Sequence, residues 1–293
     1  MLEEIQIRIH GDSSLPTLIY LPGLHGDWTL VGGFLDALDG RLRFVEITYP
    51  RTLVWSLEDY AVAIEAALAQ NGITSGWLLG ESFGSQPLWV LVGRASSRAG
   101  VESALCADFS SHRLDSTTTQ SGSSGASPHP AVKDNFQIEG VILAGGFVKH
   151  PMRWTVRLAE RLTGRMSNAL FVWIIFSYAK ISKFRYRNSP SILARIEEFV
   201  ARRTDLDRRA AQHRLHLIAG FDPRPIACRT KLPIFGLSGI FDPMVPWPFV
   251  RRWLKRNCAA LRDYKIIRSA DHNVLATAPK RSATQVLEWM NGL

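Results

Sequence analysis

A serine between two glycines, placed directly after an apolar run, most strongly limits what this chain can fold into. Gly80-Glu81-Ser82-Phe83-Gly84 follows the apolar residues 76–79. Between a buried strand and a helix, such a G-x-S-x-G segment predicts a tight, strained turn whose glycines avoid Cβ clashes. The turn would present the Ser82 hydroxyl above the sheet, at the amino end of the next helix. Because the bare pattern arises by chance in about one chain in ten of this length, the rest of the sequence decides its meaning.

An acidic residue and a histidine follow in the chain order Ser, Asp, His. Asp242 lies on a loop after the apolar residues 232–237, and His272 follows residues 264–268, which predict a last strand. Open parallel sheets bind ligands outside the carboxyl ends of their strands. Ser82, Asp242 and His272 are therefore predicted to meet, although the first and last are 190 residues apart. In this interpretation Ser82 is the nucleophile, His272 the base, and Asp242 the group that orients the imidazole.

An early strand-to-helix loop completes the predicted catalytic site. Residues 17–21 predict a strand, and the glycine-containing loop 22–27 follows it. Acyl transfer needs two N–H donors for the oxyanion, one just after the nucleophile and one from this early loop. We predict the backbone N–H groups of Phe83 and Leu24 as these donors.

With these motifs in place, the chain resembles the serine-nucleophile branch of the α/β-hydrolase superfamily, and is similar to a little-studied bacterial, esterase-like group. The matching segments lie in both halves of the chain: Leu21-Pro22-Gly23-Leu24-His25-Gly26, Gly80 to Gly84, Gly239 to Pro246, and Asp271-His272. The resemblance implies ester or thioester hydrolysis through an acyl-enzyme. It also implies a mostly parallel central sheet with helices on both faces, and a helical cap inserted before the penultimate strand. Ser85 departs from peptidase-like relatives, which usually have a second glycine there.

The length and composition agree with this organisation. A chain of 293 residues, 46% of them hydrophobic, can form one α/β domain with an accessory lobe. We expect a hydrolase core from residues 1–149 and 226–293 and a helical cap from residues 150–225. Within the core, residues 107–137 are rich in Ser, Thr and Gly and are predicted to form a low-complexity loop.

The basic charge of the chain is concentrated in the predicted cap. Residues 150–224 contain fifteen Lys and Arg against six Asp and Glu, which accounts for the whole net charge of +9. A basic stripe is predicted on one helix, since arginines recur every four residues at Arg153, Arg157, Arg161 and Arg165. The uncharged run 169–179 is too short to span a bilayer. It leaves three alternatives: a core helix, an acyl-pocket wall and an interfacial segment. An anionic membrane surface, an acidic carrier protein and an ordinary solvated face all remain open for the cap.

Other classes of site find little support. Cys106, Cys228 and Cys258 cannot all pair and match no metal-ligand spacing. His213 and His216 lack the carboxylate that a helical zinc motif would need. We therefore expect no metal, no cofactor and no nucleic-acid partner. The amino terminus has no pattern of a secretory signal, so a cytoplasmic protein is expected, with peripheral membrane association left open.

The sequence thus predicts a carboxylic ester hydrolase whose small-molecule substrate has an apolar acyl or alcohol portion. The alternative within enzymes is a thioesterase or acyl-carrier-protein esterase. The alternative of another class is a non-catalytic ligand-binding protein on the same fold.

Overall fold

The computed structural model describes residues 4–111, 136–167 and 204–292, with a few isolated residues between 168 and 203. The described chain contains a seven-stranded sheet in the order β1-β3-β2-β4-β5-β6-β7. β1 pairs antiparallel with β3, and all other neighbours are parallel. The strands are β1 (Gln6–His10), β2 (Thr17–Leu21), β3 (Arg43–Thr48), β4 (Ser75–Glu81), β5 (Gln137–Ala144), β6 (Ile234–Gly239) and β7 (Leu261–Ile267).

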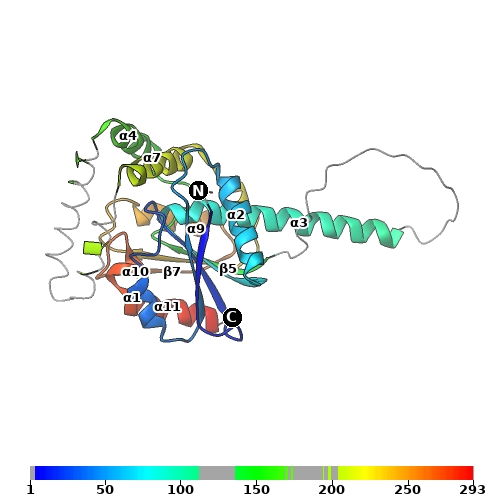
Figure 1. The fold of residues 1–293 in the computed structure, drawn as a ribbon. Helices are drawn as coiled ribbons and strands as arrows, with labels where there is room; N and C mark the ends of the chain where they lie inside the picture. Colours follow the sequence, from blue (N-terminus) through cyan, green and yellow to red (C-terminus); the bar gives the residue numbers. More distant parts are fainter. Residues whose placement is uncertain are drawn as a thin grey trace.

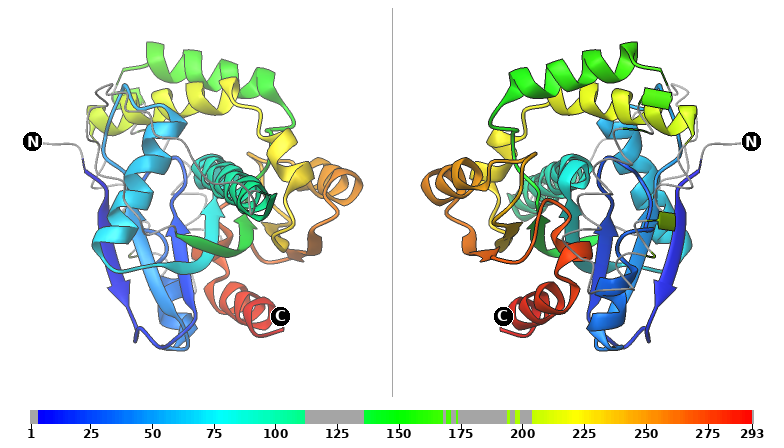
Figure 2. Two further views of the ribbon diagram at one scale, coloured as in Figure 1. Left: turned by 90° about the vertical axis from the view of Figure 1, so that its right-hand side faces the viewer. Right: turned by 90° about the vertical axis from the view of Figure 1, so that its left-hand side faces the viewer.

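Helices cover both faces of this sheet, as Figures 1 and 2 show. On one face an apolar cluster includes residues of α2 (Leu57–Gln70), α3 (Ser85–Ser111), α8 (Arg224–Arg229) and α9 (Trp247–Asn257). On the other face a second cluster includes residues of α1 (Gly32–Leu38), α10 (Val274–Thr277) and α11 (Pro279–Asn291). Every residue of β2 and β6 is buried. Central strands covered on both sides need such continuous apolar sequences, which explains why their residues do not alternate with polar ones. The predicted mostly parallel sheet with helices on both faces is therefore confirmed.

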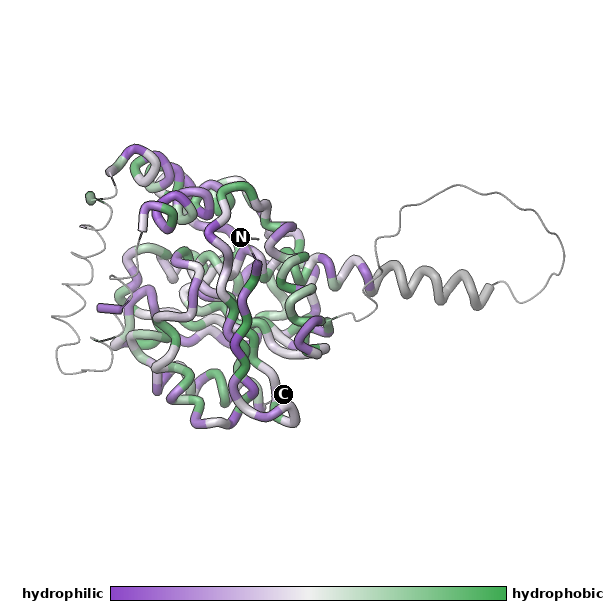
Figure 3. The backbone as a smooth tube through the Cα atoms, viewed as in Figure 1, coloured by the Kyte–Doolittle hydropathy of each residue, from purple (hydrophilic) through white to green (hydrophobic). Residues whose placement is uncertain are grey.

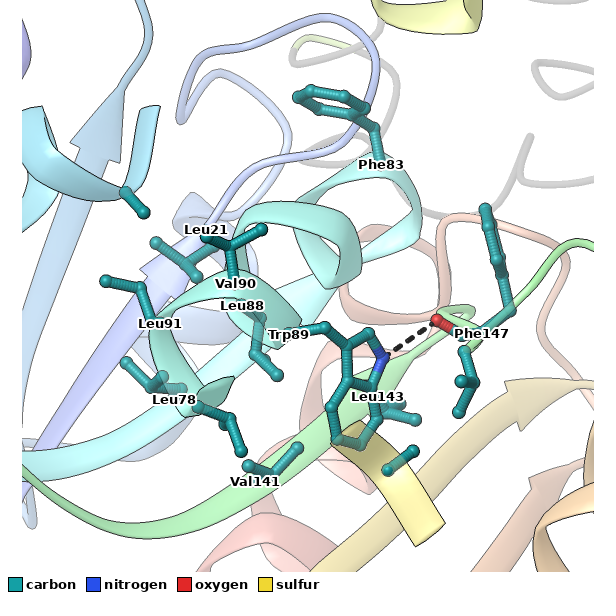
Figure 4. Packing of buried hydrophobic residues seen from close by; sticks show 14 of the residues in the cluster. Leu21, Leu78, Phe83, Leu88, Trp89, Val90, Leu91, Val141, Leu143 and Phe147 are labelled. Carbon is teal, nitrogen blue, oxygen red and sulfur yellow. Dashed lines mark hydrogen bonds between the residues drawn. The ribbon is translucent and has the colours of Figure 1, made fainter. Parts of the chain in front are cut away.

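α3 packs directly on the middle of the sheet. Figure 4 shows its side chains Leu88 and Trp89 against apolar residues of β4 and β5. The indole Nε1 of Trp89 donates a hydrogen bond of 3.2 Å to the backbone oxygen of Phe147, just beyond β5. This buried donor is thus satisfied, and it ties the helix after Ser82 to the chain that leads into the predicted cap.

The structure corrects the predicted limits of the low-complexity loop 107–137. The helix α3 continues to Ser111, and β5 begins at Gln137. Both ends of the predicted loop therefore belong to regular elements, because the helix and the strand extend beyond the apolar residues used to place them. Residues 112–135 lie outside the described part of the chain.

Two helices of the predicted cap are described, α4 (Arg153–Arg165) and α7 (Asp205–Gly220). They lie side by side above the α2–α3 face of the sheet (Figures 1 and 2). Arg153 of α4 donates a 2.6 Å hydrogen bond to the backbone oxygen of Ala219, and Arg208 of α7 donates one of 2.6 Å to that of Thr163. Figure 3 shows hydrophilic and hydrophobic residues mixed along both helices. Most of the apolar run 169–179 lies outside the described residues.

Membrane-spanning helices are not found in the part of the chain that the structure describes; every helix there is too short or too polar to cross a bilayer.

Candidate active site

Ser82 lies on a tight turn between β4 and α3, formed by η1 (Ser82–Gly84). Its φ of 49° is in the left-handed region, which non-glycine residues rarely adopt. A Cβ on Gly84 would lie 2.0 Å from the backbone oxygen of Leu21, and one on Gly80 would lie 3.0 Å from that of Gly84. Side chains at the two glycine positions would therefore collide with neighbouring backbone, and the predicted strained turn is confirmed.

The structure brings Ser82, His272 and Asp242 together in one chain of hydrogen bonds. The Ser82 Oγ lies 2.8 Å from the Nε2 of His272, and the Nδ1 of His272 lies 2.9 Å from the Oδ2 of Asp242. The three residues follow β4, β7 and β6, whose carboxyl ends lie at the same edge of the sheet. With the imidazole proton on Nδ1, His272 donates to the carboxylate and its Nε2 accepts the serine proton. This geometry is the one that a serine nucleophile with a histidine base needs.

Backbone hydrogen bonds fix the loops that carry the acid and the histidine. The Phe241 N–H donates to the Ala270 oxygen at 3.1 Å, which joins the two loops just before Asp242 and His272. The Oδ1 of Asp242 accepts the N–H groups of Met244 at 2.9 Å and Val245 at 2.8 Å. One carboxylate oxygen is thus held by its own loop, and the other is free to accept from the imidazole.

Asp271, the residue directly before His272, accepts hydrogen bonds within a turn instead of taking the place of Asp242. Its Oδ1 accepts hydrogen bonds from the Asn273 N–H at 3.0 Å and the Thr277 hydroxyl at 3.2 Å. These contacts hold both ends of the short helix α10 to the residue before His272. The structure therefore places Asp242, and not Asp271, as the hydrogen-bond partner of the His272 ring.

Two buried groups in the site have shifted pKa values. Burial alone would lower the pKa of His272, but the hydrogen bond and the charge of Asp242 outweigh it, so this pKa is raised above 6.5. Burial raises the pKa of Glu81 to about 7, against the opposing effects of the Tyr20 hydrogen bond and the His272 charge. The Tyr20 hydroxyl donates to the Glu81 Oε2 at 2.5 Å. Glu81 therefore carries a carboxyl that titrates near neutral pH directly before the candidate nucleophile.

The loop after β2 lies against the candidate nucleophile. A Cβ placed on Gly23 would be 3.4 Å from the Cβ of Ser82. The Gly26 N–H donates to the Gly23 oxygen at 3.0 Å, and the Gly26 oxygen accepts the Tyr49 N–H at 2.8 Å. Among the described residues, the Leu24 N–H has no acceptor, so it is available to an external oxygen. The second predicted donor, Phe83, follows Ser82 in the same turn.

Sequence reasoning missed two residues that support this site. Ser85 donates to the Ser82 backbone oxygen at 2.6 Å and accepts the Phe147 N–H at 3.3 Å. The available signal was that Ser85 stands where peptidase-like relatives usually have a glycine. Arg214 of α7 donates to the Leu24 oxygen at 2.8 Å. No local pattern distinguishes this arginine from the many others of the predicted cap.

The two histidines of α7 serve separate contacts. The Nε2 of His213 lies 2.8 Å from the Trp55 oxygen, whereas the Nδ1 of His216 lies 2.9 Å from the Glu160 carboxylate. They do not share a ligand. Within the described ranges, no group of three or more His, Cys, Asp and Glu side chains is arranged to hold a metal ion.

Comparisons of the sequence with protein-family models and with curated proteins find no match. Solved structures give clear matches over nearly the whole chain. A hydrolase from Pseudomonas aeruginosa is similar with a TM-score of 0.69 and 13% identity, covering 98% of this chain and 94% of that one. An enol-lactonase from Burkholderia xenovorans has a TM-score of 0.68, 16% identity, and covers 98% of this chain and 96% of that one. An esterase from Exiguobacterium antarcticum has a TM-score of 0.67, 11% identity, and covers 98% and 95%.

These similarities show that the chain has the α/β-hydrolase fold, as its motifs predicted. At such low identities the likeness is one of fold, and a fold hosts many functions. What the chain does must therefore be argued from the arrangement around Ser82.

Proposed function

We propose that this protein is a serine hydrolase that cleaves a carboxylic ester with an apolar acyl or alcohol portion. The observation that carries the proposal is the hydrogen-bonded chain from Ser82 through His272 to Asp242, on a strained turn at the carboxyl edge of the sheet. A left-handed backbone at a serine costs about 1–3 kcal/mol, and residues held in this way by their surroundings cluster at active sites.

The geometry supports a two-step acyl transfer. The Nε2 of His272 accepts the Ser82 proton as the Oγ attacks the ester carbonyl, and Asp242 stabilises the resulting imidazolium. The Leu24 and Phe83 N–H groups stabilise the negative oxygen of the tetrahedral intermediate. The C–O bond then breaks, and His272 returns the proton to the leaving alcohol. In the second step His272 takes a proton from water and the water oxygen attacks the acyl carbonyl. The bond from that carbonyl carbon to the Ser82 Oγ then breaks, and His272 returns the proton to Oγ as the carboxylic acid leaves.

The choice of an ester bond has two supports. The hydrogen bond and charge of Asp242 raise the pKa of the buried His272, which makes its imidazole a stronger base toward the Ser82 proton. The similar structures include an esterase and an enol-lactonase, and a lactone is a cyclic ester. The half-buried Leu24 side chain packs against the core beside the nucleophile and supports an apolar acyl portion.

A burst experiment distinguishes this proposal from the alternative of a non-catalytic ligand-binding protein whose triad is inactive. Parent protein mixed with p-nitrophenyl esters of increasing acyl length should release about one equivalent of p-nitrophenol rapidly, followed by steady turnover. A fluorophosphonate probe should label the parent and leave the matched Ser82→Ala variant unlabelled. Ser82→Ala should lower kcat by about 10⁴–10⁶. If the folded parent shows neither a burst nor labelling, the hydrolase is ruled out and ligand binding remains.

A further inference from the structure

Arg214 is a fully buried arginine between the predicted cap and the core. It belongs to α7 and is only 1% exposed. Its Nη1 donates to the Leu24 oxygen at 2.8 Å, its Nη2 to the Pro50 oxygen at 3.0 Å, and its Nε lies 3.4 Å from the Tyr60 hydroxyl. One guanidinium therefore joins three separate segments of the core to a helix far along the chain.

The surroundings of this cation are unusual. Within residues 4–111, 136–167 and 204–292, no carboxylate forms an ion pair with Arg214. Instead its guanidinium carbon lies 5.6 Å from the centre of the Tyr49 ring and 5.9 Å from that of Phe83. Burying a charge costs free energy unless it is hydrogen-bonded and compensated. Carbonyl oxygens and aromatic rings supply that compensation here, since rings attract cations within about 6 Å.

The contact with Arg214 holds the peptide group between Leu24 and His25, which directly follows the peptide group that carries the Leu24 N–H. Two peptide groups flank the Leu24 Cα. The first is held because the Gly23 oxygen accepts the Gly26 N–H at 3.0 Å, and the second because the Leu24 oxygen accepts Arg214. A carbonyl and its peptide N–H point in opposite directions in a planar trans peptide. The Gly23 carbonyl therefore sets the direction of the Leu24 N–H, and the bond from Arg214 to the Leu24 carbonyl holds the next peptide group and so the position of the loop.

The loop after β2 lies in close contact with the guanidinium of Arg214 at Gly26. A Cβ on Gly26 would lie 2.4 Å from the Nη1 of Arg214, and the φ of Gly26 is +81°. Only glycine fits this position, because a larger residue would both strain the backbone and displace the arginine. Loss of the guanidinium would leave unfilled space behind the loop and an unsatisfied Leu24 carbonyl, so the loop would relax.

We infer that Arg214 is a positioning residue for the oxyanion hole: by holding the Leu24 carbonyl, it keeps in place the loop whose Leu24 N–H is assigned to the ester oxygen bound at Ser82. This inference rests on the proposed function. A predicted-cap residue thereby contributes to catalysis through the core loop it supports. An optimally placed oxyanion donor is worth about 10²–10³ in rate, and a donor that is merely loosened loses part of that.

The test replaces Arg214 by Met, which keeps an unbranched apolar stem and removes the donors and the charge. Arg209→Met is the matched control, since Arg209 is an exposed arginine of the same helix. With active sites counted by fluorophosphonate, Arg214→Met should lower kcat by about 10²-fold, with KM changed less than about threefold. Affinity for an alkyl boronic acid, whose tetrahedral adduct places an oxygen in the same hole, should fall in parallel. Arg209→Met should change none of these values.

The possible results distinguish failure of the inferred role of Arg214 from failure of the proposed function. A folded Arg214→Met variant with unchanged kcat and boronic acid affinity would show that the arginine only stabilises the fold. If Arg214→Met does not fold, Arg214→Lys is assayed in the same way. The lysine variant keeps the positive charge but lacks the planar guanidinium with its several N–H donors. It should show the same loss of kcat without a change in KM. An unchanged kcat in the lysine variant also overturns the inference. A parent protein that does not react with fluorophosphonate instead refutes the proposed function.

A second, independent observation concerns the outward face of α4. Trp154, Leu158 and Leu162 recur every four residues and are 67%, 47% and 53% exposed. Arg157, Arg161 and Arg165 are exposed in an adjacent row. Residues four apart share a helix face, so the apolar and basic rows lie together along it.

Arg153, the first arginine of the predicted basic stripe, does not belong to this face. It is half-buried and bonded to the Ala219 oxygen of α7. The outward face of α4 therefore consists of three apolar side chains and three arginines. We propose that it docks on an anionic lipid surface. Trp and Leu side chains enter the boundary between headgroups and acyl chains, and guanidinium groups bind lipid phosphates.

The probe is a vesicle of phosphatidylcholine with about one-third phosphatidylserine, and the measurement is co-sedimentation at low salt. A charge-reversed variant with Arg157→Glu, Arg161→Glu and Arg165→Glu should bind at least about 10²-fold more weakly. The matched control reverses three exposed cations of α9, by Arg252→Glu, Lys255→Glu and Arg256→Glu. The net charge change is equal, and binding should fall much less.

Three results would overturn this docking proposal. They are absence of binding by the parent at low salt, equal losses in the α4 and α9 variants, and binding to an acidic carrier protein without any binding to vesicles. A further check is tryptophan fluorescence, which should shift to shorter wavelength on binding to vesicles and stay unchanged with pure phosphatidylcholine. Because the chain has nine tryptophans, the shift is assigned to Trp154 by its loss in Trp154→Phe.

Discussion

Replacement of Asp242 by Asn tests the mechanism most sharply, because the surrounding donors dictate how the new amide must sit. The Met244 and Val245 N–H groups both donate to the Oδ1 of Asp242. In the variant they require the amide oxygen at that position. The NH₂ group then faces the Nδ1 of His272 and donates to it. The imidazole proton is forced onto Nε2, which can no longer accept the proton of Ser82.

The size of the effect follows from the cost of turning the amide around. The reversed amide would leave two backbone N–H groups facing an NH₂ group, at about 1–3 kcal/mol each. A total of about 2–6 kcal/mol makes the productive tautomer rarer by roughly 30-fold to 10⁴-fold. Loss of the negative charge beside the imidazolium adds to this. We expect kcat to fall by about 10³–10⁴, and the same exchange in a serine protease triad costs about 10⁴.

The assay is steady-state hydrolysis of p-nitrophenyl butyrate, with thermal unfolding measured to show that the variant is folded. Asp271→Asn is the control. Asp271 accepts from Asn273 and Thr277, and an amide oxygen can replace one carboxylate oxygen there, so its kcat should change by less than about tenfold. If Asp242→Asn kept more than a tenth of the parent kcat, the acid of the triad would be misassigned. A large loss in Asp271→Asn alone would point to that residue.

Three further predictions concern the neighbouring groups. Leu24→Pro removes an oxyanion donor and should lower kcat by about 10²–10³, whereas Leu24→Ala keeps the amide and should mainly change acyl preference; equal losses would move the donor elsewhere. The pKa of His272 lies above 6.5 and only the neutral imidazole accepts the Ser82 proton, so kcat/KM should rise with pH through an inflection above 6.5. A pH-independent rate would exclude His272 as the base. Burial raises the pKa of Glu81 from 4.5 to about 7. The folded protein thus keeps a proton that the unfolded chain has lost, and the free energy of unfolding should fall by about 3 kcal/mol as pH rises through this window. Glu81→Gln should abolish that fall in denaturant titrations at pH 5 and pH 8, and an identical fall in the variant would assign it to other groups.

The main features of the site could be predicted because its chemistry lies at strand ends. Ser82, Asp242 and His272 each follow an apolar run, and parallel strands bring their carboxyl ends to one edge whatever the loops between them. The capping box that Ser56 and Asp59 form at the start of α2 likewise depends only on residues close together in the sequence. Such features depend on a few neighbouring residues, so the sequence alone specifies them.

Contacts between distant segments could not be predicted in this way. The pairing of β1 beside β3 joins strands whose order along the chain differs from their order in the sheet. Arg214 is one of fifteen basic residues in 150–224, and its burial depends on the packing of α7 over the core. Periodicity indicates which face of a helix is apolar, but not which single arginine will lie beneath it.

The two parts of the site are held by different means. The acid and histidine loops are joined by backbone hydrogen bonds within the core, and the turn at Ser82 is fixed by close backbone contacts. The Leu24 loop depends on a side chain from α7. Proton transfer through His272 and stabilisation of the oxyanion are therefore separable. A change that moves α7 should leave the pH inflection of His272 in place while lowering kcat, whereas a change at Asp242 should alter both. Measuring the pH profile of Arg214→Met beside that of Asp242→Asn would reveal this difference, and a shifted inflection in the arginine variant would show that the two parts are coupled.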